Sequence, residues 1–272
     1  MNPFMKKTIA FLLIAVAVFL VSCTGEEKKE VPARTVKVAI IDTGISSKAI
    51  PSEYVSEGQN YLIPDGTTED TFGHGTAVAS VILDHCSNVV LVPLVSNVYD
   101  KGKVSFVDSA TFAQMIRDSV DVYNCEIINV SSGLVLDKES IREAIEYAEE
   151  KGVLVIASAG NDYVENAGQK YYPAAYDTVL AVGALDAIGT EIASFSQRGE
   201  WVDLFAIGED VEIKTLSGGS SKEQGSSYAA AHVTAAAVGY LQKESNLSPE
   251  ELRTLLIENT ESYGAKVNPE RR

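Results

Sequence analysis

Four segments of the sequence place a carboxylate, an imidazole, an amide and a hydroxyl beside glycines and other small residues. Asp42 lies in the run Ile-Ile-Asp-Thr-Gly, and His74 lies in Phe-Gly-His-Gly-Thr. Asn161 follows Ser-Ala-Gly, and Ser227 lies in Gly-Ser-Ser-Tyr-Ala. Together these groups can perform nucleophilic catalysis, because the hydroxyl can attack, the imidazole can move its proton, the carboxylate can orient the imidazole, and the amide can stabilise an oxyanion.

Each segment alone also has an ordinary structural explanation. Asp42 could cap a turn, His74 could end a helix, and Asn161 could bond to its own loop backbone. Ser227 could be a helix N-cap. The setting still suits chemistry, since the glycines around the imidazole allow close approach of a substrate, and the start of a helix favours negative charge near the hydroxyl. The combination of the four carries the prediction.

In order and wording, the segments resemble the catalytic blocks of the subtilase family of serine peptidases, which are similar to Asp-Thr/Ser-Gly, His-Gly-Thr and Gly-Thr/Ser-Ser-Met-Ala. The order Asp, His, Ser is that of subtilisin and differs from the orders in chymotrypsin and α/β-hydrolases. The resemblance covers about residues 36–260. It implies that Ser227 is the nucleophile, His74 the general base and acid, and Asp42 the residue that orients His74. It also implies an oxyanion hole made by the Asn161 side chain and the backbone N–H of the nucleophile.

The chain departs from the family pattern at a few positions near these blocks. Ser226 and Tyr228 flank the nucleophile where relatives usually have Thr and Met, and Ala231 replaces a Pro. Ala77 stands where many relatives have a second His. These departures change packing and remove no catalytic group.

The resemblance also implies where a peptide binds. Residues 131–133 are similar to the Ser-x-Gly segment of the family, and residues 102–106 to the opposite edge, so an extended substrate is expected to pair between them as an added strand. Asp162 and Glu165 would place negative charge near the pocket for the residue before the scissile bond, which predicts Arg, Lys or a polar residue there. The predicted substrate-binding residues are Gly102, Val104, Ser131, Ser132, Gly133, Ala159, Gly160 and Asp162.

Short apolar runs alternate with helical patterns along most of the chain. Strands are expected at 36–41, 89–95, 127–131, 153–158 and 178–182, and helices at 75–83, 109–120, 138–151 and 227–243. A last helix begins at Ser248, where Glu251 completes a capping box. Unbroken apolar strands between helices predict an α/β fold, a subtilisin-like three-layer α/β/α arrangement with a mainly parallel central sheet. The four chemical segments follow strands or begin helices, so they should meet where the strands end.

Residues 1–22 are predicted to be a lipoprotein signal peptide. Lys6 and Lys7 precede an apolar run at 9–21, which is short for a membrane-spanning helix of roughly 20 residues and fits a secretory segment. The run ends in Leu-Val-Ser-Cys, which resembles the bacterial lipobox. That resemblance implies a diacylglyceryl group on Cys23 as the new N-terminus. Plain secretion and a retained membrane anchor stay open, as does translation from Met5.

Residues 23–35 are expected to be the lipidated cysteine and a flexible tether, and residues 36–272 one peptidase domain. The tether is polar and charged. No pro-domain is evident between Cys23 and Val36, which favours narrow specificity over broad digestion. We expect the protein to be exported and lipid-anchored to the outer face of the bacterial cell membrane.

The composition, 46% hydrophobic and 22% charged, is that of a chain with a packed core. A net charge of −16 argues against nucleic acid or an anionic lipid surface as partner. Cys86 and Cys125 precede strands that are not neighbours in this fold. Such strands lie at least two spacings of roughly 4.8 Å apart, and this total exceeds the ~7 Å Cα limit of a disulfide. Both cysteines are therefore expected to be free, buried thiols.

We expect a peptide or protein substrate, in particular an exported precursor such as that of a lantibiotic or another bacteriocin. Processing of surface proteins or signalling peptides and general scavenging remain alternatives. A different class, a catalytically inactive peptide-binding or immunity lipoprotein, also stays open. No cofactor is expected. Structural calcium, which is common in subtilases, stays open, but no metal site is predicted because no loop has clear calcium-ligand spacing. A monomer is the default expectation.

Overall fold

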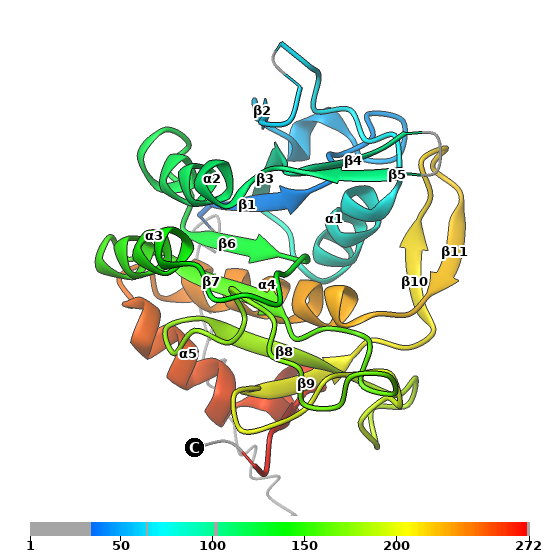
Figure 1. Cartoon of the computed structure of the whole chain (residues 1–272), viewed down its shortest axis with the longest axis vertical. Helices are drawn as coiled ribbons and strands as arrows, with labels where there is room; N and C mark the ends of the chain where they lie inside the picture. The colour runs from blue at the N-terminus through cyan, green and yellow to red at the C-terminus, as the bar shows by residue number, and fades with distance from the viewer. Residues whose placement is uncertain (1–33, 64, 101–102, 271–272) are drawn as a thin grey trace, which may run out of the picture. The chain divides into compact units, whose positions relative to one another are not determined.

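The computed structural model describes residues 34–63, 65–100 and 103–270 (Figure 1). The predicted signal peptide, the lipidated Cys23 and all but the end of the tether lie outside the described residues. So does Gly102, one of the predicted substrate-binding residues. The predictions made for these residues stay predictions.

The centre of the fold is an eight-stranded sheet with the order β12-β9-β8-β7-β6-β1-β3-β2. All its paired strands run parallel except β12, which is antiparallel to β9. The predicted mainly parallel sheet is therefore confirmed. The strands are β1 (Val36–Asp42), β2 (Gln59–Asn60), β3 (Val89–Val95), β6 (Ile127–Val130), β7 (Leu154–Ser158), β8 (Leu180–Leu185), β9 (Leu204–Ile207) and β12 (Lys266–Val267).

The predicted helices are all present, close to their expected bounds. They are α1 (His74–His85), α2 (Ser109–Asp121), α3 (Glu139–Glu150), α4 (Ser226–Lys243) and α5 (Pro249–Glu258), with short 3-10 turns η1 (Ser52–Tyr54) and η2 (Thr260–Tyr263). The capping box of α5 is confirmed, because Ser248 Oγ accepts from Glu251 N at 3.2 Å and the Glu251 carboxylate accepts from Ser248 N at 2.8 Å. Among the described helices, none is both long enough and apolar enough to cross a membrane.

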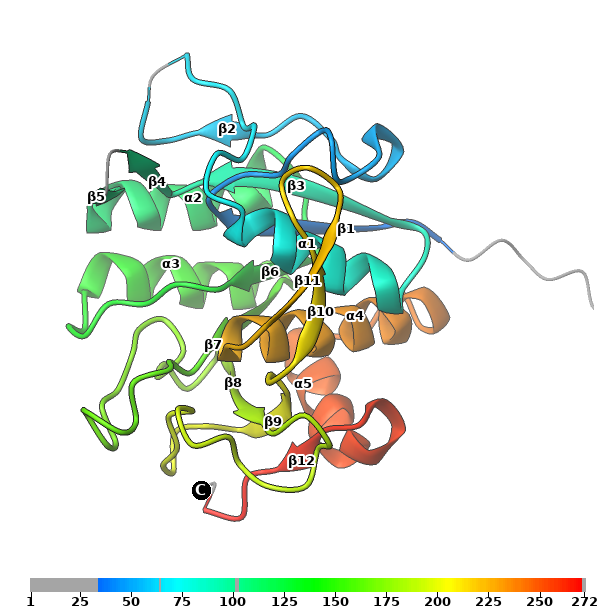
Figure 2. The same cartoon turned by 90° about the vertical axis from the view of Figure 1, so that its right-hand side faces the viewer.

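The sheet is buried on both faces, which explains its unbroken apolar strands. In β1, Val38 and Ile40 pack into one hydrophobic cluster with residues of α1 and α4. Ala39 and Ile41 point to the opposite face and pack into a second cluster with residues of α2 and α3. Figures 1 and 2 show α2 and α3 side by side, as expected if both helices cover the face of the sheet to which Ala39 and Ile41 point. The three-layer α/β/α architecture follows.

The winding of the chain creates a crevice at the carboxyl ends of β1 and β6. From β1 the chain passes through α1 to β3 on one side, and then through α2 to β6 on the other side of β1. Neighbouring strands whose connections leave in opposite directions form the crevice in which open α/β sheets hold ligands. Asp42 ends one of these strands, and Ser131 follows the other.

Several elements escaped the sequence prediction. They are β2, β9, β12 and two hairpins outside the main sheet, β4 (Asn97–Asp100) with β5 (Lys103–Phe106), and β10 (Val211–Lys214) with β11 (Ser220–Glu223). All are four residues or shorter. Strands β5 and β11 are also largely exposed and lack an apolar run, whereas β9 is apolar and buried but very short. The strand predicted at 178–182 is displaced to β8, because Val179 N donates to Tyr176 O in a turn that ends just before it.

Both described cysteines are free, as predicted, with β1 lying between the strands that they precede. Cys125 is buried, but Cys86 is only partly so, which corrects the expectation of two buried thiols. Burial raises the pKa of both thiols to about 12, so neither is a reactive thiolate.

Candidate active site

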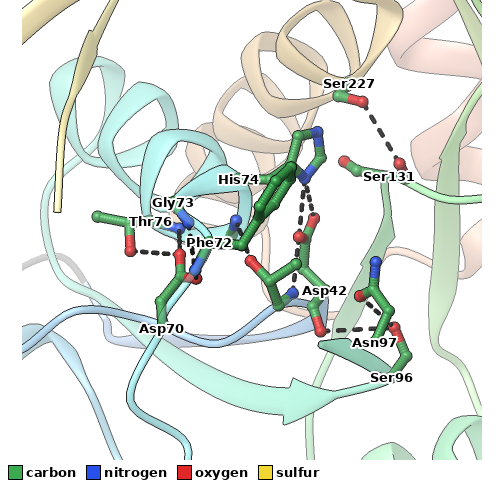
Figure 3. Close-up of polar contacts among 12 residues, drawn as sticks. Asp42, Asp70, Phe72, Gly73, His74, Thr76, Ser96, Asn97, Ser131 and Ser227 are labelled. Carbon is green, nitrogen blue, oxygen red and sulfur yellow. Dashed lines mark hydrogen bonds and ion pairs between the residues drawn. The ribbon is translucent and has the colours of Figure 1, made fainter. Parts of the chain in front are cut away.

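Strand β1 delivers Asp42 to the crevice as its last residue, with 2% of the residue exposed. Its Oδ1 accepts a hydrogen bond from Thr43 N at 2.7 Å. The two carboxylate oxygens lie 2.7 and 2.9 Å from His74 Nδ1 (Figure 3). An ionised carboxylate accepts hydrogen bonds only, so this contact places a proton on Nδ1 and leaves Nε2 free to accept one.

His74 is the first residue of α1, and its glycine neighbours are required by geometry. Gly73 has φ of 110°, in the left-handed region that side chains avoid. A Cβ on Gly75 would lie 2.3 Å from the carbonyl oxygen of Gly44, so that position also excludes a side chain. The imidazole itself is 27% exposed and can meet a substrate.

Asp70 organises the turn before α1, and the sequence analysis did not single it out. Its Oδ1 accepts from the backbone N–H groups of Phe72 (2.9 Å) and Gly73 (2.8 Å). Its Oδ2 accepts from Thr76 N at 2.9 Å and Thr76 Oγ1 at 2.6 Å. This buried carboxylate therefore satisfies the first N–H groups around the helix start and fixes the backbone that carries His74 (Figure 3).

The charges around His74 favour its protonated form. Burial works against the imidazolium and would lower the pKa of His74. The Asp42 carboxylate, through its charge and hydrogen bond, and the charge of Asp70 outweigh burial and raise that pKa above its usual 6.5. His74 must be neutral to accept a proton, so activity should be lost as pH falls through this raised pKa.

Replacing Asp70 by Asn should move the acidic limb of the kcat/KM profile to lower pH by a few tenths to about one unit, since one of the charges that raise the His74 pKa is gone. The measurement is kcat/KM of a peptide substrate between pH 5 and 9. Glu69→Gln is a matched control, because the Glu69 carboxylate accepts from Ser47 N and is not among the groups that shift His74. An unchanged or raised acidic limb in a folded Asp70→Asn enzyme would contradict the assignment.

Ser227 is the second residue of α4 and is 4% exposed. Figure 3 shows the His74 ring between Asp42 and Ser227. The Ser227 hydroxyl donates to Ser131 O at 3.4 Å, a distance at which a hydrogen bond is weak and is easily given up. Because Ser227 lies in the first turn of α4, its backbone N–H has no acceptor within the helix and can serve an oxyanion.

Asn161 is tied to the N-terminus of α4 by its side chain. Its Oδ1 accepts from Ser226 N at 2.7 Å, and Gly160 N donates to Ser226 Oγ at 3.1 Å. With the amide oxygen engaged by α4, the amide Nδ2 is the remaining donor of this side chain. A donor held beside the start of α4 is what the predicted oxyanion hole would require.

The two predicted edges of the substrate cleft lie close together. Ser132 and Gly133, directly after Ser131, share an apolar hollow with Phe106 of β5. Val104, also in β5, is 46% exposed. Ala159 is fully buried, so its side chain cannot face a substrate and only its backbone could.

Asp162 has another role than the one predicted for it. Its carboxylate accepts from Gln197 Nε2 at 2.8 Å, Asn166 Nδ2 at 2.8 Å and Tyr171 OH at 2.5 Å. Burial opposes its charge, but these three hydrogen bonds lower the pKa of Asp162 below its usual value. The carboxylate thus stays ionised and holds a loop network together, a structural role that the sequence analysis did not predict.

The order and contacts of these residues agree with one family throughout. The chain matches the subtilase family over residues 33–271. This protein is a subtilase. Subtilisin DY of Bacillus licheniformis is 30% identical over 234 residues, covering 84% of this chain and 85% of its own. Subtilisin Savinase of Lederbergia lenta is 31% identical over 234 residues, covering 85% of each.

Solved structures show the same fold. A cold adapted subtilisin-like serine proteinase superposes with a TM-score of 0.71 at 27% identity, covering 83% of this chain and 82% of that one. Prenylagaramide maturation protease PagA superposes with a TM-score of 0.65 at 23% identity, covering 81% of each chain. The predicted subtilisin-like fold and serine peptidase activity are confirmed.

In this subtilase the geometry supports hydrolysis through an acyl-enzyme. With the roles that the family resemblance implies, Ser227 Oγ would attack the scissile carbonyl while His74 Nε2 takes its proton, and Asp42 would stabilise the imidazolium. The carbonyl oxygen becomes an oxyanion facing Asn161 Nδ2 and the Ser227 N–H. His74 would then protonate the leaving amine, and a hollow lined by His74 and Tyr228 lies beside this imidazole. A water molecule would then attack the acyl-enzyme with His74 again accepting the proton, which releases the acyl group from Ser227.

Within the described ranges, no group of three or more His, Cys, Asp and Glu side chains is placed to hold a metal ion. The proton transfers above use only the side chains already named.

Proposed function

We propose that this serine endopeptidase matures a specific exported peptide, such as a bacteriocin or lantibiotic precursor, at the outer face of the cell membrane. A lipid on Cys23 and the tether after it would hold the enzyme there. The support for the anchor is the likeness of residues 20–23 to a lipobox.

The observation that carries the substrate proposal is a set of large, exposed apolar side chains in β5 and in the segment after β6. Phe106 on β5 is 58% exposed, and Val135 and Leu136, which follow Gly133 in the segment after β6, are 53% and 61% exposed. Large apolar side chains are seldom left in water in such groups without a partner. Alternate side chains of an extended peptide point to the same face, so a precursor with apolar residues at alternate positions before the cleavage site would cover them.

The PagA structure supports this proposal only by analogy, since at 23% identity it shows the fold alone. It is an example of a maturation protease built on this fold. An inactive peptide-binding or immunity lipoprotein is disfavoured, because the chain retains the family's Asp, His, Asn and Ser and because Asp42 contacts His74.

The proposal is tested by mass spectrometry of exported peptides from cells that carry the wild-type, Ser227→Ala or Cys23→Ser protein. We expect one or a few precursors to accumulate uncut with Ser227→Ala and to be shortened with the wild type. The wild-type enzyme should occur in the membrane fraction with a diacylglyceryl-modified Cys23 at its N-terminus, and Cys23→Ser should lack that modification. Cys86→Ser is the control cysteine and should remain lipidated.

Two results would contradict the proposal. Broad degradation of unrelated exported peptides by the wild type would indicate a scavenging peptidase. An N-terminus other than lipidated Cys23 in the mature wild-type protein would remove the anchor.

A further inference from the structure

The place of the residue before the scissile bond, here called the acyl residue, follows from the catalytic groups. Its carbonyl carbon must reach Ser227 Oγ, which lies 3.4 Å from Ser131 O, directly after β6. Its carbonyl oxygen must face Asn161, in the segment after β7. Strands β6 and β7 are parallel neighbours, so the acyl residue lies over the gap between the two segments that leave them.

Tyr171 fills this gap. A Cβ built on Gly160, in the segment after β7, would lie 2.7 and 2.9 Å from Cδ2 and Cε2 of the Tyr171 ring. A Cβ on Gly133, in the segment after β6, would lie 3.1 Å from Tyr171 Cβ and 3.5 Å from Cδ1. The side chain of Tyr171 thus packs against both walls, and at Gly160 the distances leave no room for a Cβ unless the ring moves.

The ring is held from both ends. Its hydroxyl donates to Asp162 Oδ2 at 2.5 Å, and Gln197 and Asn166 hold that carboxylate in turn. Burial, together with the hydrogen bond and charge of Asp162, raises the pKa of Tyr171 to about 12, so the hydroxyl stays a donor. The next residue, Tyr172, exchanges backbone hydrogen bonds of 2.8 Å with Leu134 in the opposite wall. A network of this kind fixes the ring across the gap.

We propose that Tyr171 restricts the acyl residue to glycine, alanine or serine. A larger side chain would have to displace a ring that is packed on two sides and hydrogen-bonded at its tip. The inference rests on the peptidase function above and names the substrates that its site accepts. It differs from the expectation of a basic acyl residue, because the side chains of Arg and Lys are also too large for a space that Tyr171 occupies.

The test is a series of synthetic peptides that differ only in the acyl residue, with Gly, Ala, Leu, Phe or Arg at that position. For the wild type, we expect kcat/KM after Ala to exceed that after Leu, Phe or Arg by about 100-fold, as is usual when a pocket excludes the larger group. Tyr171→Ala should raise cleavage after Leu and Phe by a similar factor and change cleavage after Ala much less. Tyr171→Phe keeps the ring without its hydroxyl and should retain most of the preference for small residues.

Labelling with a fluorophosphonate probe verifies that each variant has a working nucleophile, so a misfolded variant is not read as a change of specificity. Equal cleavage after Phe and Ala by the wild type would overturn the proposal, and so would an unchanged ratio in labelled Tyr171→Ala. Because the peptides are synthetic, the ratio does not depend on whether an exported precursor is the natural substrate. Failure of the proposed function and failure of this inference are therefore distinguishable.

Discussion

Ser227→Ala should lower kcat by about 10⁶-fold, the size of loss known for the same replacement in subtilisin, which we adopt for this relative. The nucleophile is lost, and with it the acyl-enzyme route that His74 and Asp42 support. Stability should change little, because Ser227 Oγ makes only the 3.4 Å contact with Ser131 O. The measurements are kcat with a peptide substrate, labelling by a fluorophosphonate, and Tm.

Ser226→Ala is the matched control, since two adjacent serines begin α4. Ser226 is fully buried, and its Oγ accepts a hydrogen bond from Gly160 N. We therefore expect Ser226 to have a structural role and not to act as the nucleophile. Ser226→Ala should still be labelled by the fluorophosphonate. Its Tm should be lower, because losing the hydrogen bond should reduce the free energy of unfolding by about 1 kcal/mol. Labelling that persists in Ser227→Ala, or that disappears in a folded Ser226→Ala, would contradict the assignment of the nucleophile.

The catalytic residues could be predicted from the sequence because each has a local signature. Asp42 ends an apolar strand, and glycines flank His74 for steric reasons that hold wherever that turn occurs. A parallel sheet then brings the segments together without further information, since its strands end along one edge. For these residues the local sequence and the fold point to the same arrangement.

Residues that act through distant contacts could not be found in this way. Tyr171 looks like any aromatic residue of a loop, and only the folded chain places it between Gly133 and Gly160. Asp162 was predicted to face a substrate because it follows Asn161, but its three donors come from elsewhere in the loops. Asp70 had a usable signal, four residues before His74, in its match to the N–H groups that a helix start leaves unpaired.

Asn161→Ala should lower kcat by about 10²–10³-fold, again the loss known for this replacement in subtilisin. Asn161 Nδ2 is expected to donate to an oxygen that carries full charge only in the transition state, so KM should change little. The structure suggests a second variant, Asn161→Asp, which tests the loss of the Nδ2 donor more specifically. Its side chain could still accept from Ser226 N, as Asn161 Oδ1 does at 2.7 Å, but it offers a charged oxygen where the donor was.

Asn161→Asp should therefore lose more activity than Asn161→Ala, although it preserves more of the native contacts. Asn166→Ala is the control in the same loop, because Asn166 donates to Asp162 and not to the oxyanion, and its kcat with an alanine acyl residue should stay within about threefold of the wild type. A raised KM with unchanged kcat in Asn161→Ala would mean that the amide binds the ground-state carbonyl. Only the opposite pattern, a lowered kcat at constant KM, is compatible with a donor set in place by α4 for the transition state.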